Sequence, residues 1–295
     1  MSLRYLLCPK PQKGSSTTAI VTLINILEDI SVEDNNNKSD EKVSQQVEKL
    51  VQETFKDGLC PEREKVINAV LRFRKNSDRL LQLCSRILKS SVYHIVKNND
   101  TLKPKKYVEL PRSKYGKPYI PSEDYEISLS HQYPYIGIVS HASSNNPIGL
   151  DIVVMKDIDL KAFDGMFTSS EWLRINHDLH TFYIYWSMKE AYTKALGLGM
   201  SLNFNSFELH LPEHVTWDYI RKNPKGIGVA VDIESSPGRR NSWFFFFYPL
   251  MQYQSEGCVC ICVNNEINFI FKWTKMSQMI KWHNGEILGA ESLWA

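Results

Sequence analysis

The chain has 295 residues, of which 43% are hydrophobic and 23% are charged, a composition that excludes a disordered protein and allows one large domain or two ordinary ones. Its net charge of +2 favours neither nucleic acid nor a membrane surface as a partner. No run of 18 apolar residues occurs, and the apolar patch near the N-terminus is shorter than a signal-peptide core. We therefore expect neither a membrane-spanning helix nor a leader.

The first predicted elements lie between residues 33 and 117. Residues 33–42 are polar and unpatterned, which predicts a flexible insertion. From Pro61 onward, apolar residues recur every three or four positions, and this period predicts two helices separated around residues 75–77. A short strand flanked by basic residues and prolines is expected within residues 103–117.

The middle of the chain is predicted to contain strands followed by helices. Three strands are expected from their alternating or continuous apolar residues, at Tyr125–Leu129, Tyr135–Ser140 and Ile148–Val154. Residues 168–171, Thr-Ser-Ser-Glu, form a capping-box signature that opens a helix. A longer helix is expected from about Phe182 to Leu196, where Gly197 is a suitable C-terminal cap.

The last third is predicted to be rich in strands. Residues 204–211 alternate, and Ser242–Leu250 is expected to pair with Cys258–Val263. A closing strand at Asn268–Trp273 is expected to lead into a short helix through Met276 and Ile280. Helices therefore mix with mainly antiparallel strands, which predicts an α+β fold rather than alternating βαβ units.

Three of the six cysteines lie within one predicted strand. Cys258, Cys260 and Cys262 alternate with apolar residues, which is typical of a strand buried on both faces. Thiolates in a line along one strand cannot surround a metal tetrahedrally, so we expect no metal site there. Without a pattern of paired cysteines, we expect a reducing, cytoplasmic location.

The predicted helix at residues 182–196 and the strand before it carry candidate reactive residues. Trp186, Glu190 and Lys194 are spaced by four and share one helix face, although an exposed ion pair would show the same spacing. Asp151 stands in an apolar strand, where a carboxylate is costly to bury unless its charge is compensated. The two acids can share a divalent ion such as Mg²⁺, and the alternative is an aspartate at a surface edge without a ligand.

Ser130 and His131 follow another predicted strand and can offer a hydroxyl and an imidazole to an anion, although such a pair is by itself a weak motif. The chain has neither a G-x-S-x-G elbow nor a G-x-x-x-x-G-K-[ST] loop. These absences argue against a serine hydrolase and against a P-loop kinase.

Three segments, in this order, resemble the Sfp-type 4′-phosphopantetheinyl transferases: Tyr115–Pro118 with Ile127–His131, then Ile148–Ile152, then Trp186–Met200. The last is the most specific, because it combines W-x-x-K-E-x-x-x-K with G-x-G directly after it. The resemblance covers roughly residues 60–265. Within the family the chain is most similar to the fungal lysine-pathway members that activate aminoadipate reductase.

The resemblance implies transfer of the 4′-phosphopantetheine arm of coenzyme A to a serine of an apo carrier protein, with release of adenosine 3′,5′-bisphosphate. It implies that Asp151 and Glu190 hold Mg²⁺ and that Glu190 is the general base. Lys194 would neutralise charge on the pyrophosphate. The nucleotide phosphates would be bound by Lys117, Ser130 and His131.

The resemblance also implies a pseudo-dimer of two similar α+β halves, residues 1–146 and 147–295, with the active site in the cleft between them. A monomer is expected because one chain contains both halves.

Two positions depart from the family pattern. Val153 replaces a second acid, whose place a water can take, and Ala69 replaces a basic residue that meets the 3′-phosphate. Lys65 is expected to reach that phosphate instead, ahead of Arg63 or Arg72.

Two other functions remain open from the sequence. The first is a non-catalytic module that binds coenzyme A or a carrier protein. The second is a nucleic-acid binder using the basic residues of 103–117, which the near-neutral charge disfavours. We expect these lysines to form a solvated face or to contact an acidic carrier protein. Aminoadipate reductase is the first expected carrier, followed by fatty-acid and polyketide carriers, with no nucleic acid and no membrane as partners.

Overall fold

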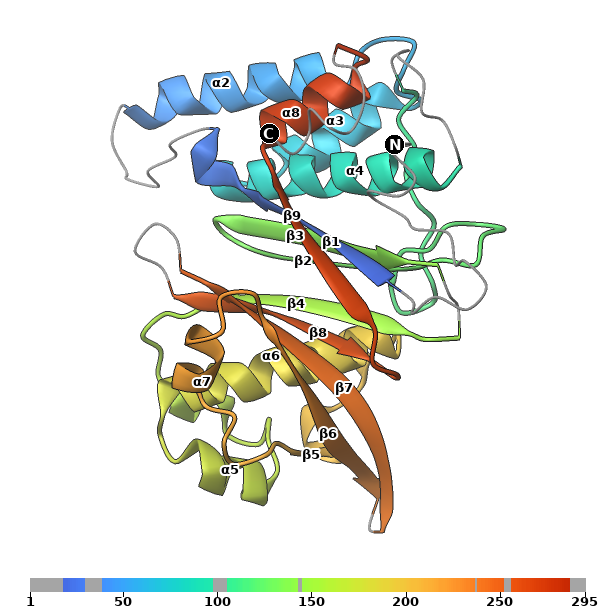
Figure 1. Cartoon of the computed structure of the whole chain (residues 1–295). Coiled ribbons are helices and arrows are strands. Elements are labelled where there is room, and N and C mark those ends of the chain that lie inside the picture. The colour runs from blue at the N-terminus through green and yellow to red at the C-terminus, as the bar shows by residue number, and fades with distance from the viewer. Residues whose placement is uncertain are drawn as a thin grey trace.

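The computed structural model describes residues 18–29, 39–97, 105–142, 145–236, 238–251 and 256–286. Two β-sheets are stacked face to face, and helices cover the outer face of each (Figure 1). This arrangement confirms the predicted α+β class. Within the described ranges, no helix is long and apolar enough to cross a membrane.

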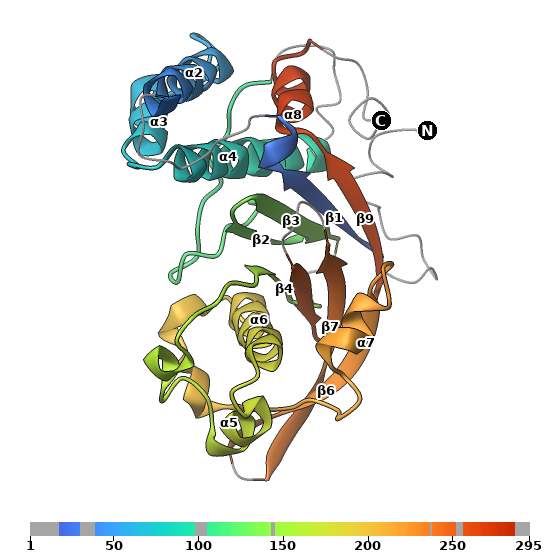
Figure 2. The same cartoon turned by 90° about the vertical axis from the view of Figure 1, so that its left-hand side faces the viewer.

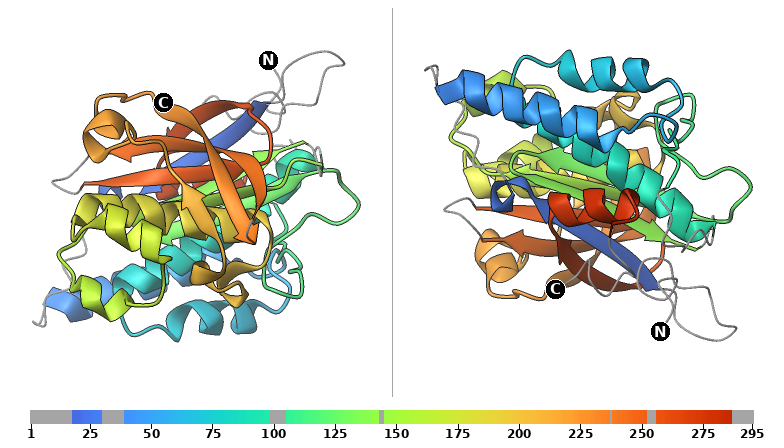
Figure 3. Two further views of the ribbon diagram at one scale, coloured as in Figure 1. Left: turned by 90° about the horizontal axis from the view of Figure 1, so that it is seen from below. Right: turned by 90° about the horizontal axis from the view of Figure 1, so that it is seen from above.

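The first sheet contains four strands. In spatial order they are β2 (Glu126–Gln132), β3 (Tyr135–His141), β1 (Thr18–Asn25) and β9 (Asn268–Thr274). All neighbours are antiparallel except β1 and β9, which run parallel. Its outer face is covered by α2 (Ser39–Thr54), α3 (Arg63–Leu71), α4 (Asn76–Val96) and α8 (Met276–His283), as the right-hand view of Figure 3 shows.

The second sheet contains five antiparallel strands. In spatial order they are β4 (Ile148–Val154), β8 (Gly257–Val263), β7 (Arg239–Leu250), β6 (Ile227–Ser236) and β5 (Glu208–His210). Its helices are α5 (Ser169–Ile175), α6 (Leu179–Ala195) and α7 (Trp217–Arg221), and Figure 2 shows α6 in the concave side of the curved sheet. Short 3-10 turns occur at Ile26–Glu28, Leu160–Phe163, Gly199–Ser201 and Phe204–Ser206.

Strand β8 shows how the alternation of side chains divides the interior. Cys258, Cys260 and Cys262 face the core beneath α6, and the intervening Val259 and Ile261 face the other sheet. The prediction of a strand buried on both faces is therefore confirmed. All five cysteines in the described part of the chain are buried and free.

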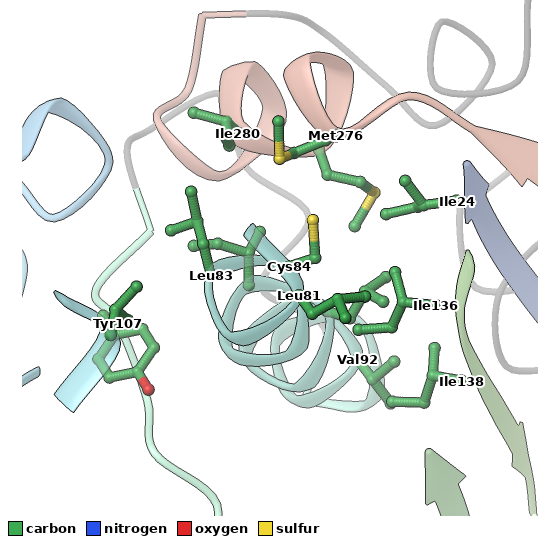
Figure 4. Packing of buried hydrophobic residues seen from close by; sticks show 14 of the residues in the cluster. Ile24, Leu81, Leu83, Cys84, Val92, Tyr107, Ile136, Ile138, Met276 and Ile280 are labelled. Carbon is green, nitrogen blue, oxygen red and sulfur yellow. The ribbon is translucent and has the colours of Figure 1, made fainter. Parts of the chain in front are cut away.

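Helix α4 fills the core between the first sheet and α8. Figure 4 shows apolar side chains of α4, among them Leu81 and Val92, packed against β3 on one side and against α8 on the other. Ile136 of β3 and Met276 and Ile280 of α8 belong to the same cluster. The helix is strongly amphipathic, so its remaining face is free to present polar groups elsewhere.

The two sheets meet where β2 lies beside β4. Ser128 Oγ accepts a hydrogen bond from the Leu150 amide at 2.9 Å. Gln132 accepts one from the Val154 amide at 2.7 Å and donates one to the Val154 carbonyl at 3.1 Å. Because side chains alternate along a strand, Ser130 lies on the same face between these two residues. This polar row gives hydrogen-bond partners to backbone groups of Leu150 and Val154 on the outer edge of β4.

Close packing of α6 on β4 depends on Gly149. A Cβ atom at this position would lie 1.9 Å from the Ala191 carbonyl oxygen and 2.4 Å from the Ala195 amide nitrogen. Both are helix backbone atoms and cannot move aside individually. The missing side chain therefore allows the helix to reach the strand.

We expect Gly149→Ala to destabilise the protein by at least about 1–3 kcal/mol, because overpacking here must displace α6. Urea unfolding measures the loss. Gly137→Ala is the matched control, because its methyl group would meet mainly the flexible side chains of Leu23 and Ile152. Equal stability losses in the two variants would contradict the role of Gly149.

Several predicted elements are confirmed. The break between the two N-terminal helices falls at residues 72–75, and Thr168 forms the capping box of α5. β7 and β8 pair as expected, and β9 leads into α8. Helix α6 begins at Leu179, earlier than predicted, because Asp178 accepts a hydrogen bond from the Thr181 amide and caps it.

Other predictions are wrong. Residues 39–42 of the expected insertion form the start of α2. The first turn of this helix is polar in sequence, so the apolar period was not recognised there. Residues 33–38 lie outside the described part of the chain. No strand forms in residues 105–117, where Arg112 makes only an isolated bridge to Pro118, and the first two residues of that predicted strand are not described. Prolines remove the donors that a strand needs. The strand expected at 204–211 is reduced to β5 after a 3-10 turn.

Strands β1 and β6 and helices α2 and α7 were not predicted. The pairing of β1 with β9 brings residues from opposite ends of the chain into one sheet (Figure 1). The first sheet therefore includes a strand from beyond residue 147.

Candidate active site

Asp151 occupies the middle of β4 and is 5% exposed. Its Oδ1 accepts a hydrogen bond from Ser130 Oγ at 2.9 Å and another from Lys194 Nζ at 2.6 Å. The buried carboxylate is therefore compensated by an ammonium group from α6 and a hydroxyl from β2. The alternative of a surface-edge aspartate is not what the structure shows.

Glu190 and Lys194 face this aspartate from α6. Lys194 Nζ lies 3.8 Å from Glu190 Oε2 and 2.9 Å from Ser130 Oγ, in addition to its contact with Asp151. One ammonium group thus links the two carboxylates. Glu190 and Lys194 are therefore not the exposed ion pair that their spacing of four also allowed, because the side chain of Glu190 is only 14% exposed.

Burial raises the pKa of Glu190, and the nearby charge of Asp151 raises it further, while Lys194 opposes both effects. A carboxyl group with a raised pKa is a better proton acceptor near neutral pH. The structure thus places a carboxylate with a raised pKa beside an ammonium group.

A cavity of about 410 Å³ opens beside this cluster. Ser130, His131 and Lys194 line it, while Asp151 and Glu190 lie behind Ser130 and Lys194. The other lining residues come from α4, from the 112–118 segment, from β2 and from the turn after α6: Gln82, Ser85, Lys89, Arg112, Tyr115, Gly116, Lys117, Pro118, Ser128, Leu129, Gly197 and Gly199. The cavity therefore takes its walls from the first sheet and from helices of both layers.

His131 extends from β2 at the cavity wall. Desolvation lowers its pKa, and the Lys194 ammonium lowers it further. The neutral form of the imidazole is therefore favoured, and it can donate one hydrogen bond and accept another.

Lys117 also lines the cavity, but its ammonium group is held by three acceptors. It donates to Glu126 Oε2 at 2.6 Å, to the Ile148 carbonyl at 3.1 Å and to the Ala195 carbonyl at 3.2 Å. These contacts join the starts of β2 and β4 to the end of α6. In this arrangement Lys117 fixes the cavity wall.

Lys65 is not brought to the cavity. It lies on α3 with a side chain that is 74% exposed, and its ammonium group pairs with Glu62 at 3.0 Å. It borders a separate surface hollow together with other charged residues of the same segment.

Two basic residues at the cavity were not predicted. Lys89 belongs to α4, and Arg112 precedes the Tyr115–Pro118 motif. The signal for Lys89 was its spacing from Gln82 and Ser85, which places all three on one polar helix face.

Lys189, which precedes Glu190 in the motif, has no access to solvent. Its ammonium group lies 2.8 Å from Glu171 Oε2 and donates to the carbonyls of Phe204 and Phe207 at 2.6 and 2.7 Å. Glu171 in turn accepts hydrogen bonds from the Thr168 and Leu209 amides. This ion pair ties α5 and β5 to α6 and so supports Glu190 from behind.

At the position where the sequence resemblance implies a second acid, the chain has Val153, which faces α6 from the same side of β4 as Asp151. Its side chain is 2% exposed and packs in the apolar core. No group of three or more possible metal ligands of the His, Cys, Asp or Glu type occurs among the residues that the structure describes.

The segment that contains Asp151, Glu190 and Lys194 is similar to a known protein family. Residues 147–223 match the model of the 4′-phosphopantetheinyl transferase superfamily. The matched segment includes Asp151, Glu190 and Lys194 and extends from β4 through α7.

Individual phosphopantetheinyl transferases are similar over different shares of the chain. The L-aminoadipate-semialdehyde dehydrogenase-phosphopantetheinyl transferase of Candida glabrata is 26% identical over 45% of this chain and 53% of its own length. The phosphopantetheinyl transferase of Thraustochytrium is 29% identical over 69% of each. The Sfp transferase of Bacillus subtilis is 36% identical over 35% of this chain and 48% of its own. The first and third matches thus span about half of those relatives.

Proposed function

We propose that the chain is an enzyme that transfers the 4′-phosphopantetheine arm of coenzyme A to a serine of an apo carrier protein. The observation that carries this proposal is the Asp151–Lys194–Glu190 cluster beside the cavity. The volume of the cavity, about 410 Å³, lies in the range of small-molecule sites. The lysines and the arginine that line the cavity suit a ligand with several phosphates.

The donor set is suitable for Mg²⁺. Asp151 and Glu190 both approach one cationic group, and in the described part of the chain Asp151 Oδ2 and Glu190 Oε1 have no hydrogen-bond partner. Mg²⁺ prefers one or two carboxylates completed by phosphate oxygens and water. When bound, the ion would neutralise charge on the pyrophosphate, and water would occupy the place that Val153 leaves without an acid.

Each residue of the cluster has a separate task in this proposal. Glu190 takes the proton from the carrier serine, directly or through a water. Lys194 stabilises negative charge on the pyrophosphate as the phosphorus–oxygen bond breaks. Ser130 and His131 orient phosphate oxygens at the wall. Lys117 serves the same ligand by holding the wall in place.

The proposal extends to the setting of the enzyme. We propose a monomeric pseudo-dimer whose two halves meet at the cavity, acting in the cytoplasm. The free cysteines are consistent with a reducing location. The name of the Candida glabrata relative supports aminoadipate reductase of the lysine pathway as the first carrier to test.

Intact-mass spectrometry of apo carrier domains incubated with the protein, coenzyme A and Mg²⁺ tests the activity. We expect a mass gain of one phosphopantetheine arm that is lost with EDTA. No gain on lysine-pathway, fatty-acid and polyketide carriers, despite measurable coenzyme A binding, would instead support a non-catalytic binding module.

Lys194→Met is expected to raise the pKa of Glu190 further, because Lys194 is the charge that lowers it. A base must be deprotonated to act, so the acid limb of the pH–rate profile should move to higher pH. The rate at the optimum should fall roughly 10²- to 10³-fold. Carboxyl NMR titration of Glu190 without metal measures the pKa directly.

The exposed Lys225→Met, which makes the same change of charge on the surface, should leave the titration unchanged. A Glu190 pKa that falls or stays constant in Lys194→Met would show that the ammonium does not control this carboxylate.

A further inference from the structure

One face of α4 presents polar side chains to the cavity. Gln82, Ser85 and Lys89 all line it and are separated by three and four residues, so they form a single row along the helix. Lys89 is 5% exposed, which is unusual for a lysine. The accessible space next to this side chain is therefore the cavity.

The surroundings of Lys89 contain more positive than negative charge. Its ionic contact in the described part of the chain is Glu109, 3.8 Å away. The Glu109 carboxylate is already engaged by Arg86 and by the hydroxyl of Tyr107. Arg112 adds a further positive charge at the cavity wall. One carboxylate, Glu109, thus faces the three cations Lys89, Arg86 and Arg112. The cluster has an excess of positive charge, which a bound anion would neutralise.

Electrostatics agrees with this geometry. Burial lowers the pKa of Lys89 to about 8, Glu109 partly offsets this effect, and Arg112 and Arg86 add to it. A phosphate monoester has a second pKa near 6 and carries close to two negative charges at neutral pH. Such a group beside Lys89 would restore its full protonation.

We propose that Lys89 is a specificity-determining residue that binds the phosphate monoester of the ligand in the cavity, which for coenzyme A is its 3′-phosphate. This inference rests on the proposed function for the identity of the ligand. It assigns the role that the sequence suggested for Lys65, whose ammonium is paired with Glu62 outside the cavity. The pyrophosphate is left to Lys194 and Ser130, which contact Asp151, and to His131, which also lines the cavity.

Isothermal titration calorimetry of coenzyme A and of 3′-dephospho-coenzyme A tests the assignment. We expect Lys89→Met to weaken binding of coenzyme A roughly 10- to 100-fold, the effect of losing one charged hydrogen bond. Binding of dephospho-coenzyme A should remain unchanged. Lys65→Met removes the same charge outside the cavity and should alter neither affinity.

Two results would overturn the proposal: unchanged affinity for coenzyme A, or equal losses for both ligands, which would indicate a structural role. If Lys89→Met does not fold, reductive methylation of the wild-type protein decides. Coenzyme A should protect Lys89 from methylation more than dephospho-coenzyme A does, and equal protection would contradict the role.

These binding measurements are independent of turnover. Discrimination that depends on Lys89 without any transfer to a carrier would sustain this inference and reject the proposed activity. Transfer to a carrier by an enzyme that binds coenzyme A and dephospho-coenzyme A equally well would support the proposed activity and reject the inference on Lys89.

Discussion

Glu190→Gln is expected to reduce transfer to the carrier serine by roughly 10²- to 10⁴-fold, the usual contribution of a general base. The amide keeps the size of the side chain but cannot accept the proton, and it weakens the donor set for Mg²⁺. Stability should be retained, because no backbone hydrogen bond to this carboxylate occurs among the described residues and because burial raises its pKa. Single-turnover mass spectrometry at saturating coenzyme A measures the rate of the chemical step.

Glu213→Gln makes the same chemical change at an exposed position and should transfer at the wild-type rate. A variant at position 190 with near-normal turnover would remove Glu190 as the base. Unchanged affinity for coenzyme A without Mg²⁺, together with the lost rate, would place the defect in the chemical step.

Lys189→Met is expected to destabilise the fold by about 3–5 kcal/mol, because it leaves the carboxylate of Glu171 buried without its partner. The Phe204 and Phe207 carbonyls also lose their donor. Guanidinium unfolding followed by circular dichroism measures the loss. The effect should exceed that of any surface lysine, although Lys189 does not line the cavity.

The double variant Lys189→Met with Glu171→Gln tests the origin of this loss. Removing the second charge should recover part of the stability, because a neutral amide can still accept the Leu209 amide hydrogen bond. Lys225→Met is the exposed control and should unfold like the wild type. Additive losses in the double variant would mean that the pair is not coupled.

The sequence was most informative where chemistry and periodicity coincide. In the helix at residues 182–196, Ile184, Met188 and Ala191 form the buried face, while Glu190 and Lys194 occupy the neighbouring one, as their spacing indicates. Asp151 was recognisable because a charge in an apolar strand needs a partner. That partner, Lys194, was among the predicted residues, but their direct contact is visible only in three dimensions.

What the sequence did not reveal depends on tertiary contacts. Lys89 has the spacing of an ordinary surface lysine on an amphipathic helix, and only the approach of β2 and the 112–118 segment encloses it. Lys117 was expected to bind phosphate, but its three acceptors come from elements far apart in the chain. Strand β1 was missed although its residues are apolar, because its partners lie more than a hundred residues away.

The parallel pairing of β1 with β9 has a consequence for synthesis of the protein. Until Asn268–Thr274 leaves the ribosome, β1 is an edge strand whose backbone groups on one side have no partner. The nascent chain carries this open edge while the strands of the second sheet are made, and such an edge is a template for pairing with other extended segments.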